Sequence, residues 1–204
     1  MKVSNIFKHF WIICRHKFWV GYYCFKFGLY WQGIVHDLSK FSLTEFWESV
    51  KYYNGSRSPI DVCKEKNGVS KAWLHHKGRN KHHYEYWQDN FDSGTTHLRI
   101  TFKYVLEMCC DFLGAGKAYY RKDFTYLKEF YWWLDNMDKK KAMNEDAKMF
   151  VTIFFYRISD SQELFKFNKK ELESLYEDRD LLISEYNEIL DYIELYNLRK
   201  RNKK

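Results

Sequence analysis

Apolar residues recur three and four positions apart along most of the chain, and no stretch of convincing length alternates apolar with polar residues. This spacing follows the 3.6-residue turn of an α-helix, and the chain contains one proline, Pro59. The pattern therefore predicts an all-α protein. The segments expected to be helical are 4–28 (where the pattern allows a break near His16), 30–40, 42–53, 70–77, 81–90, 97–120, 123–137, 142–160 and 169–198.

A loop is expected between the helices at 42–53 and 70–77. Its sequence, "NGSRSPIDVCKEKNG", contains the Asn, Gly, Ser and Pro residues that are typical of turns. Ser70 follows this loop as an N-cap, because its hydroxyl can accept a hydrogen bond from the first turn of the next helix.

The apolar stretch "FWVGYYCFKFGLYWQGIV", residues 18–35, is long enough to raise the question of a membrane span. Lys26 lies in its middle, glycines interrupt it, and His16 and His36 bracket it, which favours a pair of buried helices instead. The N-terminus shows no apolar run that ends in a small-residue cleavage site, so no signal peptide is expected. We expect no membrane partner.

The last predicted helix is strongly acidic apart from one apolar stripe. Residues 171–194 carry nine acidic side chains against one basic side chain. The stripe consists of Leu172, Leu175, Leu182, Tyr186, Ile189, Ile193 and Tyr196. It can pack on the rest of the chain or on a partner helix, including that of a second copy. We expect a helical core at 1–125, C-terminal helices at 126–204 that pack on it, and a solvated basic tail at 199–204.

The composition indicates one folded domain in a reducing compartment. The chain has 204 residues, of which 46% are hydrophobic, enough for a substantial core. Five cysteines, an odd number with no CxxC spacing, argue against a disulfide framework or a structural zinc knuckle. A cytoplasmic location is therefore expected.

Positive charge and histidine are concentrated in the first half of the chain. The net charge is +7, although residues 171–194 contribute −8, and residues 1–90 hold 14 Lys and Arg against 7 acidic residues. All eight histidines lie between His9 and His97. This distribution favours an anionic substrate such as a phosphate ester, although a solvated lysine-rich surface would give the same counts. No nucleic-acid-binding motif accompanies the charge, so nucleic acid is not an expected partner.

The segment "HDLSKF" places His36 and Asp37 side by side at the end of an apolar run. An imidazole nitrogen and a carboxylate oxygen in adjacent residues can converge on one cation. Lys40 follows one helical turn after His36, so its ammonium reaches the same side and can hold a phosphoryl group near a metal.

Four histidines crowd into "WLHHKGRNKHHYEYW", residues 73–87. They are His75, His76, His82 and His83. Burying imidazoles without partners is costly, so these rings are either exposed, hydrogen-bonded to Tyr and backbone groups, or bound to metal. Imidazole and carboxylate ligands without thiolate suit Mn, Fe, Zn, Co or Ni.

Asp111 lies within the apolar helix "EMCCDFLGAGKAYYRKD", where a carboxylate must be paired or must ligate a metal. A salt bridge to a core Lys or Arg is the structural alternative. Glu107, one turn earlier, could hold a ligating histidine or ligate metal itself. Gly114 and Gly116 keep the helix thin enough for the close approach of a neighbour. Lys117 and Arg121 are plausible phosphate partners.

The order of these motifs resembles the HD-domain superfamily of all-helical, metal-dependent phosphohydrolases. "HDLSK" is similar to its H-D-[IL]-[GS]-K signature, and "HHKGRNKHHYE" resembles, in compressed form, the extra histidines of the HD-GYP branch. "DFLGAGKAYYR" is similar to that branch's D-x-x-x-A helix with a following Arg, but the GYP tripeptide is missing. Residues 5–125 resemble more closely a family of bacterial and phage proteins called DUF5662, for which "NKHHYEYW" is the most specific block.

The HD resemblance implies an HD-like helical bundle that binds one or two divalent transition metal ions. The implied metal ligands are His16, His36, Asp37 and Asp111 for the primary ion, and His76, His82 and His83 for a second. His9 lies one heptad before His16 and could replace it. Asp37 and Lys40 are the implied catalytic residues, and Lys40, Lys117 and Arg121 are the expected substrate-binding residues.

We therefore expect a metal-dependent phosphohydrolase that acts on a nucleotide or another small phosphorylated substrate. Two alternatives remain open on the sequence. One is a di-iron oxygenase of HD type, and the other is a non-catalytic bacterial or phage interaction protein whose histidines are structural.

Overall fold

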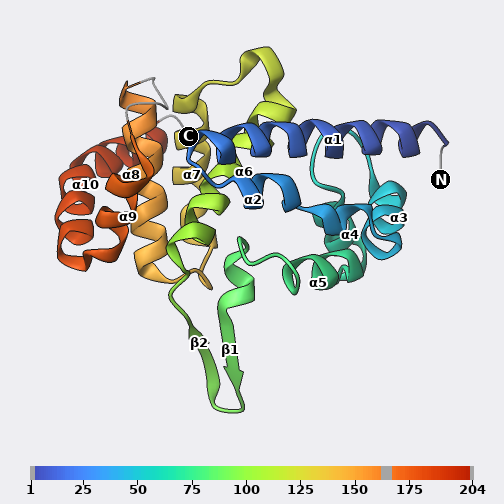
Figure 1. Cartoon of the computed structure of the whole chain (residues 1–204), viewed down its shortest axis with the longest axis horizontal. Coiled ribbons are helices and arrows are strands. Elements are labelled where there is room, and N and C mark those ends of the chain that lie inside the picture. The colour runs from blue at the N-terminus through green and yellow to red at the C-terminus, as the bar shows by residue number, and fades with distance from the viewer. Residues whose placement is uncertain (1–2, 162–166, 203–204) are drawn as a thin grey trace.

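The computed structural model describes residues 3–161 and 167–202, which form ten α-helices and one small hairpin (Figure 1). The helices are α1 (Val3–Lys26), α2 (Tyr30–Val35), α3 (Leu43–Tyr52), α4 (Pro59–Asn67), α5 (Lys71–Lys77), α6 (Phe102–Tyr120), α7 (Tyr126–Asn136), α8 (Glu145–Ser161), α9 (Lys169–Glu177) and α10 (Arg179–Arg201). Short 3₁₀ turns are η1 (Leu38–Phe41), η2 (Tyr84–Trp87), η3 (Arg121–Asp123) and η4 (Met137–Lys139). The antiparallel strands are β1 (Gln88–Phe91) and β2 (Gly94–His97).

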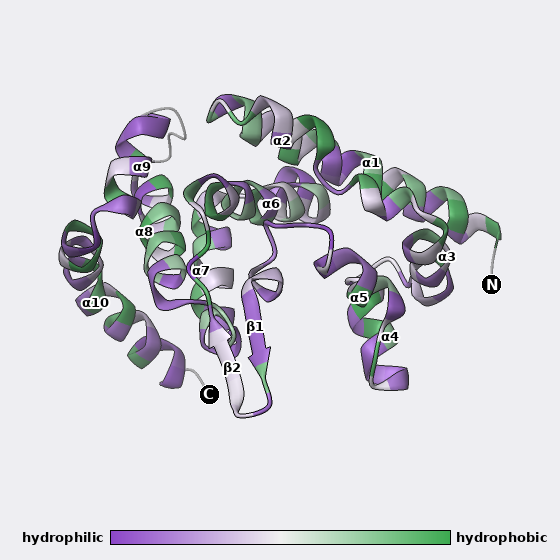
Figure 2. Cartoon of the chain, turned by 60° about the horizontal axis from the view of Figure 1, so that its bottom comes forward, coloured by the Kyte–Doolittle hydropathy of each residue, from purple (hydrophilic) through white to green (hydrophobic). Residues whose placement is uncertain are grey.

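Helix α6 is the centre of the molecule, with α1 and α2 on one side and α7 and α8 on the other (Figure 2). Its contact with α1 is close because Gly114 carries no side chain. A Cβ atom at Gly114 would lie 2.3 Å from Cγ2 and 2.8 Å from the backbone nitrogen of Val20. The glycine therefore allows the backbones of α1 and α6 to approach, as the small residues of this segment predicted.

The C-terminal helices share the core of the molecule. One cluster of buried apolar residues extends from Val20 on α1 through Leu113 on α6 to Leu182 and Ile189 on α10. The buried indole of Trp133 donates to Oγ1 of Thr152 at 2.9 Å, so its polar atom is satisfied inside the core.

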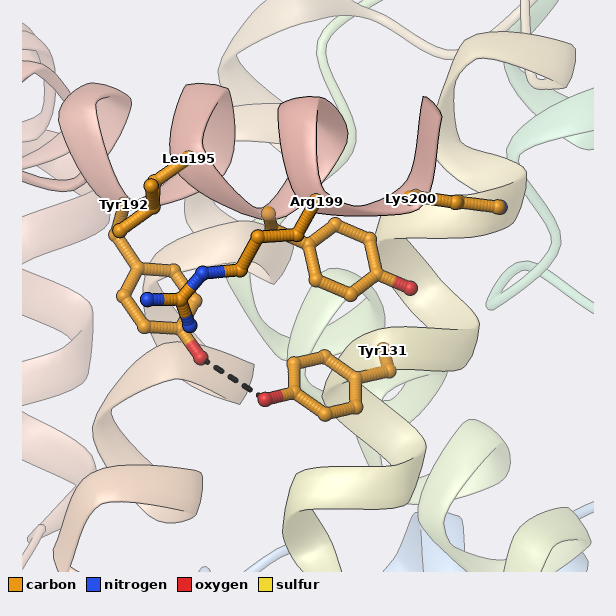
Figure 3. Close-up of a pocket in the computed structure, with 6 residues that line it drawn as sticks. Tyr131, Tyr192, Leu195, Arg199 and Lys200 are labelled. Carbon is orange, nitrogen blue, oxygen red and sulfur yellow. Dashed lines mark hydrogen bonds between the residues drawn. The ribbon is translucent and has the colours of Figure 1, made fainter. Parts of the chain in front are cut away.

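The last turns of α10 pack on α7 through tyrosines (Figure 3). The rings of Tyr131 and Tyr196 are stacked with centroids 4.8 Å apart, and the hydroxyls of Tyr131 and Tyr192 lie 3.3 Å apart. The apolar stripe predicted for the last helix thus packs, at least in part, on the chain itself. Of the predicted basic tail, residues 203–204 lie outside the described residues.

The all-α prediction is confirmed, and α1 runs through His16 without a break. The loop predicted for residues 54–68 is wrong in part, because α4 forms there. Pro59 stands at the start of this helix, where its missing N–H costs no hydrogen bond, and Gly68 closes it at φ 75°. The turn residues of this segment therefore mark the two ends of a short helix.

The helix predicted for residues 81–90 is also wrong. This segment forms η2 and then the hairpin, which projects from the helices (Figure 1). All four residues of β2 are exposed, so the hairpin leaves no alternating pattern that the sequence could reveal. The helix predicted for 169–198 divides at Asp178, whose side chain caps α10 by accepting from the backbone N–H of Leu181 at 3.0 Å.

Among the described helices, none combines the length and the apolar character that crossing a membrane requires.

Candidate metal centre

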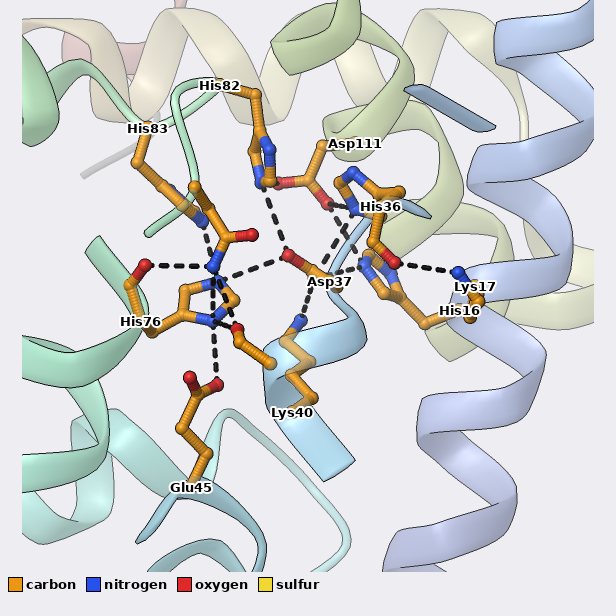
Figure 4. A network of polar contacts seen from close by, with 12 residues as sticks. His16, Lys17, His36, Asp37, Lys40, Glu45, His76, His82, His83 and Asp111 are labelled. Atoms are coloured by element: carbon orange, nitrogen blue, oxygen red, sulfur yellow. Dashed lines mark hydrogen bonds and ion pairs between the residues drawn. The ribbon is translucent and has the colours of Figure 1, made fainter. Parts of the chain in front are cut away.

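The centre is built around the turn that follows α2. His36 ends the helix, and Asp37 takes a left-handed conformation with φ 53°. Few residues other than glycine adopt this conformation, and Asp is one that tolerates it. Lys17 on α1 holds the turn in place, because its ammonium donates to the carbonyls of Ile34 at 2.6 Å and His36 at 2.8 Å (Figure 4).

One set of atoms that could hold a metal ion joins α1, this turn and α6. We call it the first donor set, and it comprises His16, His36, Asp37 and Asp111. Nε2 of His16 lies 3.3 Å from Oδ2 of Asp37 and 3.1 Å from Oδ1 of Asp111. Nε2 of His36 lies 3.3 Å and 3.4 Å from the same two oxygens. Side chains from three separate parts of the sequence therefore direct nitrogen and oxygen atoms at one point.

The second donor set uses the other oxygen of Asp37 and three histidines from α5 and the segment that follows it. It comprises Asp37, His76, His82 and His83. Oδ1 of Asp37 lies 3.3 Å from Nε2 of His76 and 3.4 Å from Nε2 of His82. Nε2 of His76 and Nε2 of His83 are 2.8 Å apart. Asp37 thus offers one oxygen to each donor set (Figure 4).

Several of these atoms are buried and find no hydrogen-bond partner within residues 3–161 and 167–202. They are Nε2 of His16, His36 and His82, and Oδ1 of Asp37, whereas Oδ2 of Asp37 faces the ammonium of Lys40. They lie near one another without hydrogen-bonding geometry, although burying unsatisfied polar atoms is costly. A cation at each point would satisfy them together. The buried His and Asp clusters could therefore hold a metal ion.

Two buried glutamates orient the histidines. Oε1 of Glu107 lies 3.0 Å from Nδ1 of His36 and 3.2 Å from Nδ1 of His82. Oε2 of Glu45 lies 2.8 Å from Nδ1 of His76. A carboxylate only accepts hydrogen bonds, so these contacts hold a proton on Nδ1 of each ring and direct its Nε2 atom at the donor sets.

The charges of the cluster keep both aspartates ionised. Burial alone would raise the pKa of Asp37, but the neighbouring His36 and Lys40 hold that pKa well below its usual range. The pKa of Asp111 is likewise held low against the effect of burial by its close side-chain contacts with His16 and His36. The pKa of His83 is lowered by burial and by nearby imidazoles, which favours the neutral form that ligates metals.

A cavity of about 210 Å³ opens beside the first donor set. It is lined by His16 and Asp111 of that set, and also by Lys40 and His9. The ammonium of Lys40 lies 2.5 Å from Oδ2 of Asp37. A small anion in this cavity would therefore meet both a cation and the face of the first donor set.

The structure brings together all seven residues predicted as metal ligands. His16, and not His9, belongs to the cluster. His9 packs against the rings of Phe46 and Tyr53, with centroids 5.6 Å away in each case. His75 contacts Glu45 and belongs to neither donor set.

Two predicted substrate-binding residues do not reach this place. The ammonium of Lys117 lies over the rings of Trp19 and Phe124, 5.4 Å and 5.1 Å from their centroids. Arg121 is exposed at the end of α6 with φ 51°. Neither residue lines the cavity beside the first donor set, because the helical turn after Asp111 carries both away from it.

Sequence reasoning missed Lys17 and Glu45. Each lies in an amphipathic segment where a charged residue is usually solvated, and the contact of each depends on a residue from another element. Glu107 was expected to hold a histidine, and it contacts two.

Comparison with known proteins places the whole cluster inside one family match. The model of a family of unknown function, DUF5662, matches residues 5–156, which include both donor sets and extend past α6 into α8. No curated protein and no solved structure matches the chain. Because the match covers most of its length, the chain belongs to the DUF5662 family.

Proposed function

We propose that the protein is a metal-dependent phosphohydrolase that acts on a nucleotide or another small phosphorylated compound. The observation that supports this proposal best is the pair of donor sets that share Asp37, beside a cavity that contains Lys40. Nitrogen and oxygen ligands without thiolate fit one or two divalent ions of Mn, Fe, Zn, Co or Ni. The resemblance to HD-domain phosphohydrolases, carried by the order of these residues, points to the same chemistry.

Divalent ions in the two donor sets would supply electrophilic activation of a phosphoryl group and of a water molecule. The side chains of the chain do the remaining work. Lys40 faces the cavity and compensates negative charge that develops on the phosphoryl oxygens. Glu107 and Glu45 fix the tautomers of three ligating histidines. Asp37 contributes one oxygen to each donor set and so fixes the position of one set relative to the other. The free cysteines support a reducing, cytoplasmic setting for this activity.

Metal content tests the proposal first. The protein is purified without chelator or histidine tag, and metals are measured by mass spectrometry in the wild type, Asp37→Ala and His82→Ala. We expect one or two equivalents in the wild type, loss of all metal in Asp37→Ala, and loss from the second donor set in His82→Ala. His75→Ala is the matched control, because His75 contacts Glu45 but belongs to neither set.

Phosphate release from a panel of nucleotides and from p-nitrophenyl phosphate then tests the reaction. A wild-type protein that binds no metal after reconstitution with Mn, Fe and Zn would overturn the proposal. Bound iron with colour, oxygen consumption and no phosphate release would instead favour the di-iron oxygenase. Metal-free protein that still folds would leave the histidines as structure.

A further inference from the structure

A second cavity adjoins the one at the metal centre. Its volume is about 280 Å³, and both cavities are lined by Ser58, Ala115 and Tyr119. Ala115 lies one helical turn after Asp111, so the two cavities follow the same side of α6. A ligand whose anionic group rests at the first donor set can therefore extend past Ala115 into the second cavity.

The second cavity has aromatic walls and one buried carboxyl group. Phe112 and Trp132 line it, with ring centroids 5.5 Å apart, together with Tyr119 and Tyr120. Apolar rings with few polar groups are typical of pockets that bind a flat organic ligand, because the rings stack and the polar groups set orientation.

The carboxyl group belongs to Glu129 on α7, which is 3% exposed. Among the described residues, its Oε2 atom has no hydrogen-bond partner. The carboxyl lies against Gly116, where a Cβ atom would collide with it. An unpaired buried carboxyl lowers stability, and such groups often serve a ligand. Burial also raises the pKa of Glu129 to about 8, and either protonation state keeps an acceptor oxygen.

We propose that the second cavity binds the base of a nucleotide substrate, and that Glu129 accepts a hydrogen bond from an exocyclic amino group of that base. This inference rests on the proposed function, because the phosphate of the same molecule would lie beside Lys40 and the first donor set. The base stacks against the aromatic walls, and the sugar passes Ala115. Glu129 is thus a specificity residue for adenine or guanine nucleotides over hypoxanthine or uracil nucleotides.

The test compares AMP and GMP with IMP and UMP on the metal-loaded protein, with p-nitrophenyl phosphate as a substrate too short for the second cavity. Glu129→Leu is expected to lower kcat/KM for AMP or GMP by about 10-fold to 100-fold, the usual effect of one lost hydrogen bond in a buried site. It should change kcat/KM for IMP and p-nitrophenyl phosphate less than 3-fold. Glu129→Gln retains a carbonyl oxygen at the same place and should retain the preference.

Ala115→Leu supplies an independent variant. It should lower kcat/KM for every nucleotide, IMP included, by a larger factor than for p-nitrophenyl phosphate, because it narrows the passage between the cavities. Equal losses for all substrates in Glu129→Leu, or no preference for amino bases in the wild type, would overturn the base site.

Binding measurements separate this inference from the proposed function. Calorimetric titration with AMP, GMP and IMP needs no turnover. In one outcome no compound releases phosphate, but AMP and GMP still bind more tightly than IMP, and Glu129→Leu removes the difference in affinity. This result would support the base site and contradict the hydrolase activity. If p-nitrophenyl phosphate is hydrolysed while nucleotides neither bind nor react, the hydrolase stands and the base site falls.

Discussion

Glu107 contacts two imidazoles, one in each donor set, from a buried position on α6. Both rings contact the same oxygen, Oε1, so an amide in its place is a weaker acceptor for both or presents its NH₂ group to both. We expect Glu107→Gln to lower metal affinity about 10-fold to 100-fold, a typical effect for the partner of a ligating histidine. Competition with a fluorescent chelator measures this. Glu65→Gln, at an exposed ion pair with Arg57, is the matched control and should bind metal like the wild type.

The raised pKa of Glu129 predicts how the stability of the protein depends on pH. The folded protein keeps the proton up to about pH 8, whereas the unfolded chain loses it near the usual pKa of 4.5. The folded state therefore binds more protons between these values, and this residue makes the free energy of unfolding fall as pH rises.

Glu129→Gln removes the ionisable carboxyl group and therefore this fall in the free energy of unfolding. The variant should match the wild type near pH 4.5 and exceed it increasingly up to pH 8, by at most about 1.4 kcal/mol for each pH unit. Urea denaturation at a series of pH values measures the difference. A difference that stays constant with pH would show that the carboxyl is ionised inside the fold.

At the scale of elements, the position of His16 depends on how closely α1 approaches α6. Gly114→Ala places a methyl group against Val20, including its backbone, so one helix must move. We expect a loss of about 1–3 kcal/mol in the free energy of unfolding, as in other overpacked cores, together with weaker metal binding. Chemical denaturation and metal content measure both effects.

Gly21→Ala is the control in the facing helix. A Cβ atom there would meet only the carbonyl oxygen of Gly33 at 3.4 Å, and the backbone conformation is an ordinary helical one. Stability should stay the same or rise by up to about 1 kcal/mol, since alanine favours helix over glycine. Equal losses in the two variants would contradict the role assigned to the contact between Gly114 and Val20.

The elements that the sequence predicts well are those whose apolar positions repeat over several turns, such as α6 and α8. Helix α4 was missed because Pro59 and Gly68 are as common in loops as at helix ends. The hairpin was missed because both of its strands are almost entirely exposed, so their residues show no apolar pattern. The residues that come together in the two donor sets could be predicted from motif order. Lys17, Glu45 and the second cavity could not, because each depends on which faces of distant helices meet.

At the scale of the whole molecule, the two halves of the chain share one apolar core. Leu182 on α10 is fully buried in the same cluster as Val20 on α1. We expect Leu182→Ala to lower the free energy of unfolding by about 2–4 kcal/mol through loss of burial and the cavity that remains. Urea denaturation should show one transition, with tryptophan fluorescence and metal release changing together.

Leu195→Ala is the matched control on the same helix, because Leu195 is 47% exposed. Its effect should stay within about 0.5 kcal/mol. Two separate transitions in the wild type, with metal released in only one, would instead mean that the segments on either side of residue 125 fold independently.

Both donor sets depend on the single carboxylate of Asp37, so the loss of this residue affects both. A descendant of this protein could lose His83 and still keep the first donor set whole, since that histidine belongs to the second set alone. No substitution at residue 37 leaves either set complete. Loss of His16 or Asp111 would likewise leave the second set whole, whereas replacement of Asp37 would disturb both sets in one step.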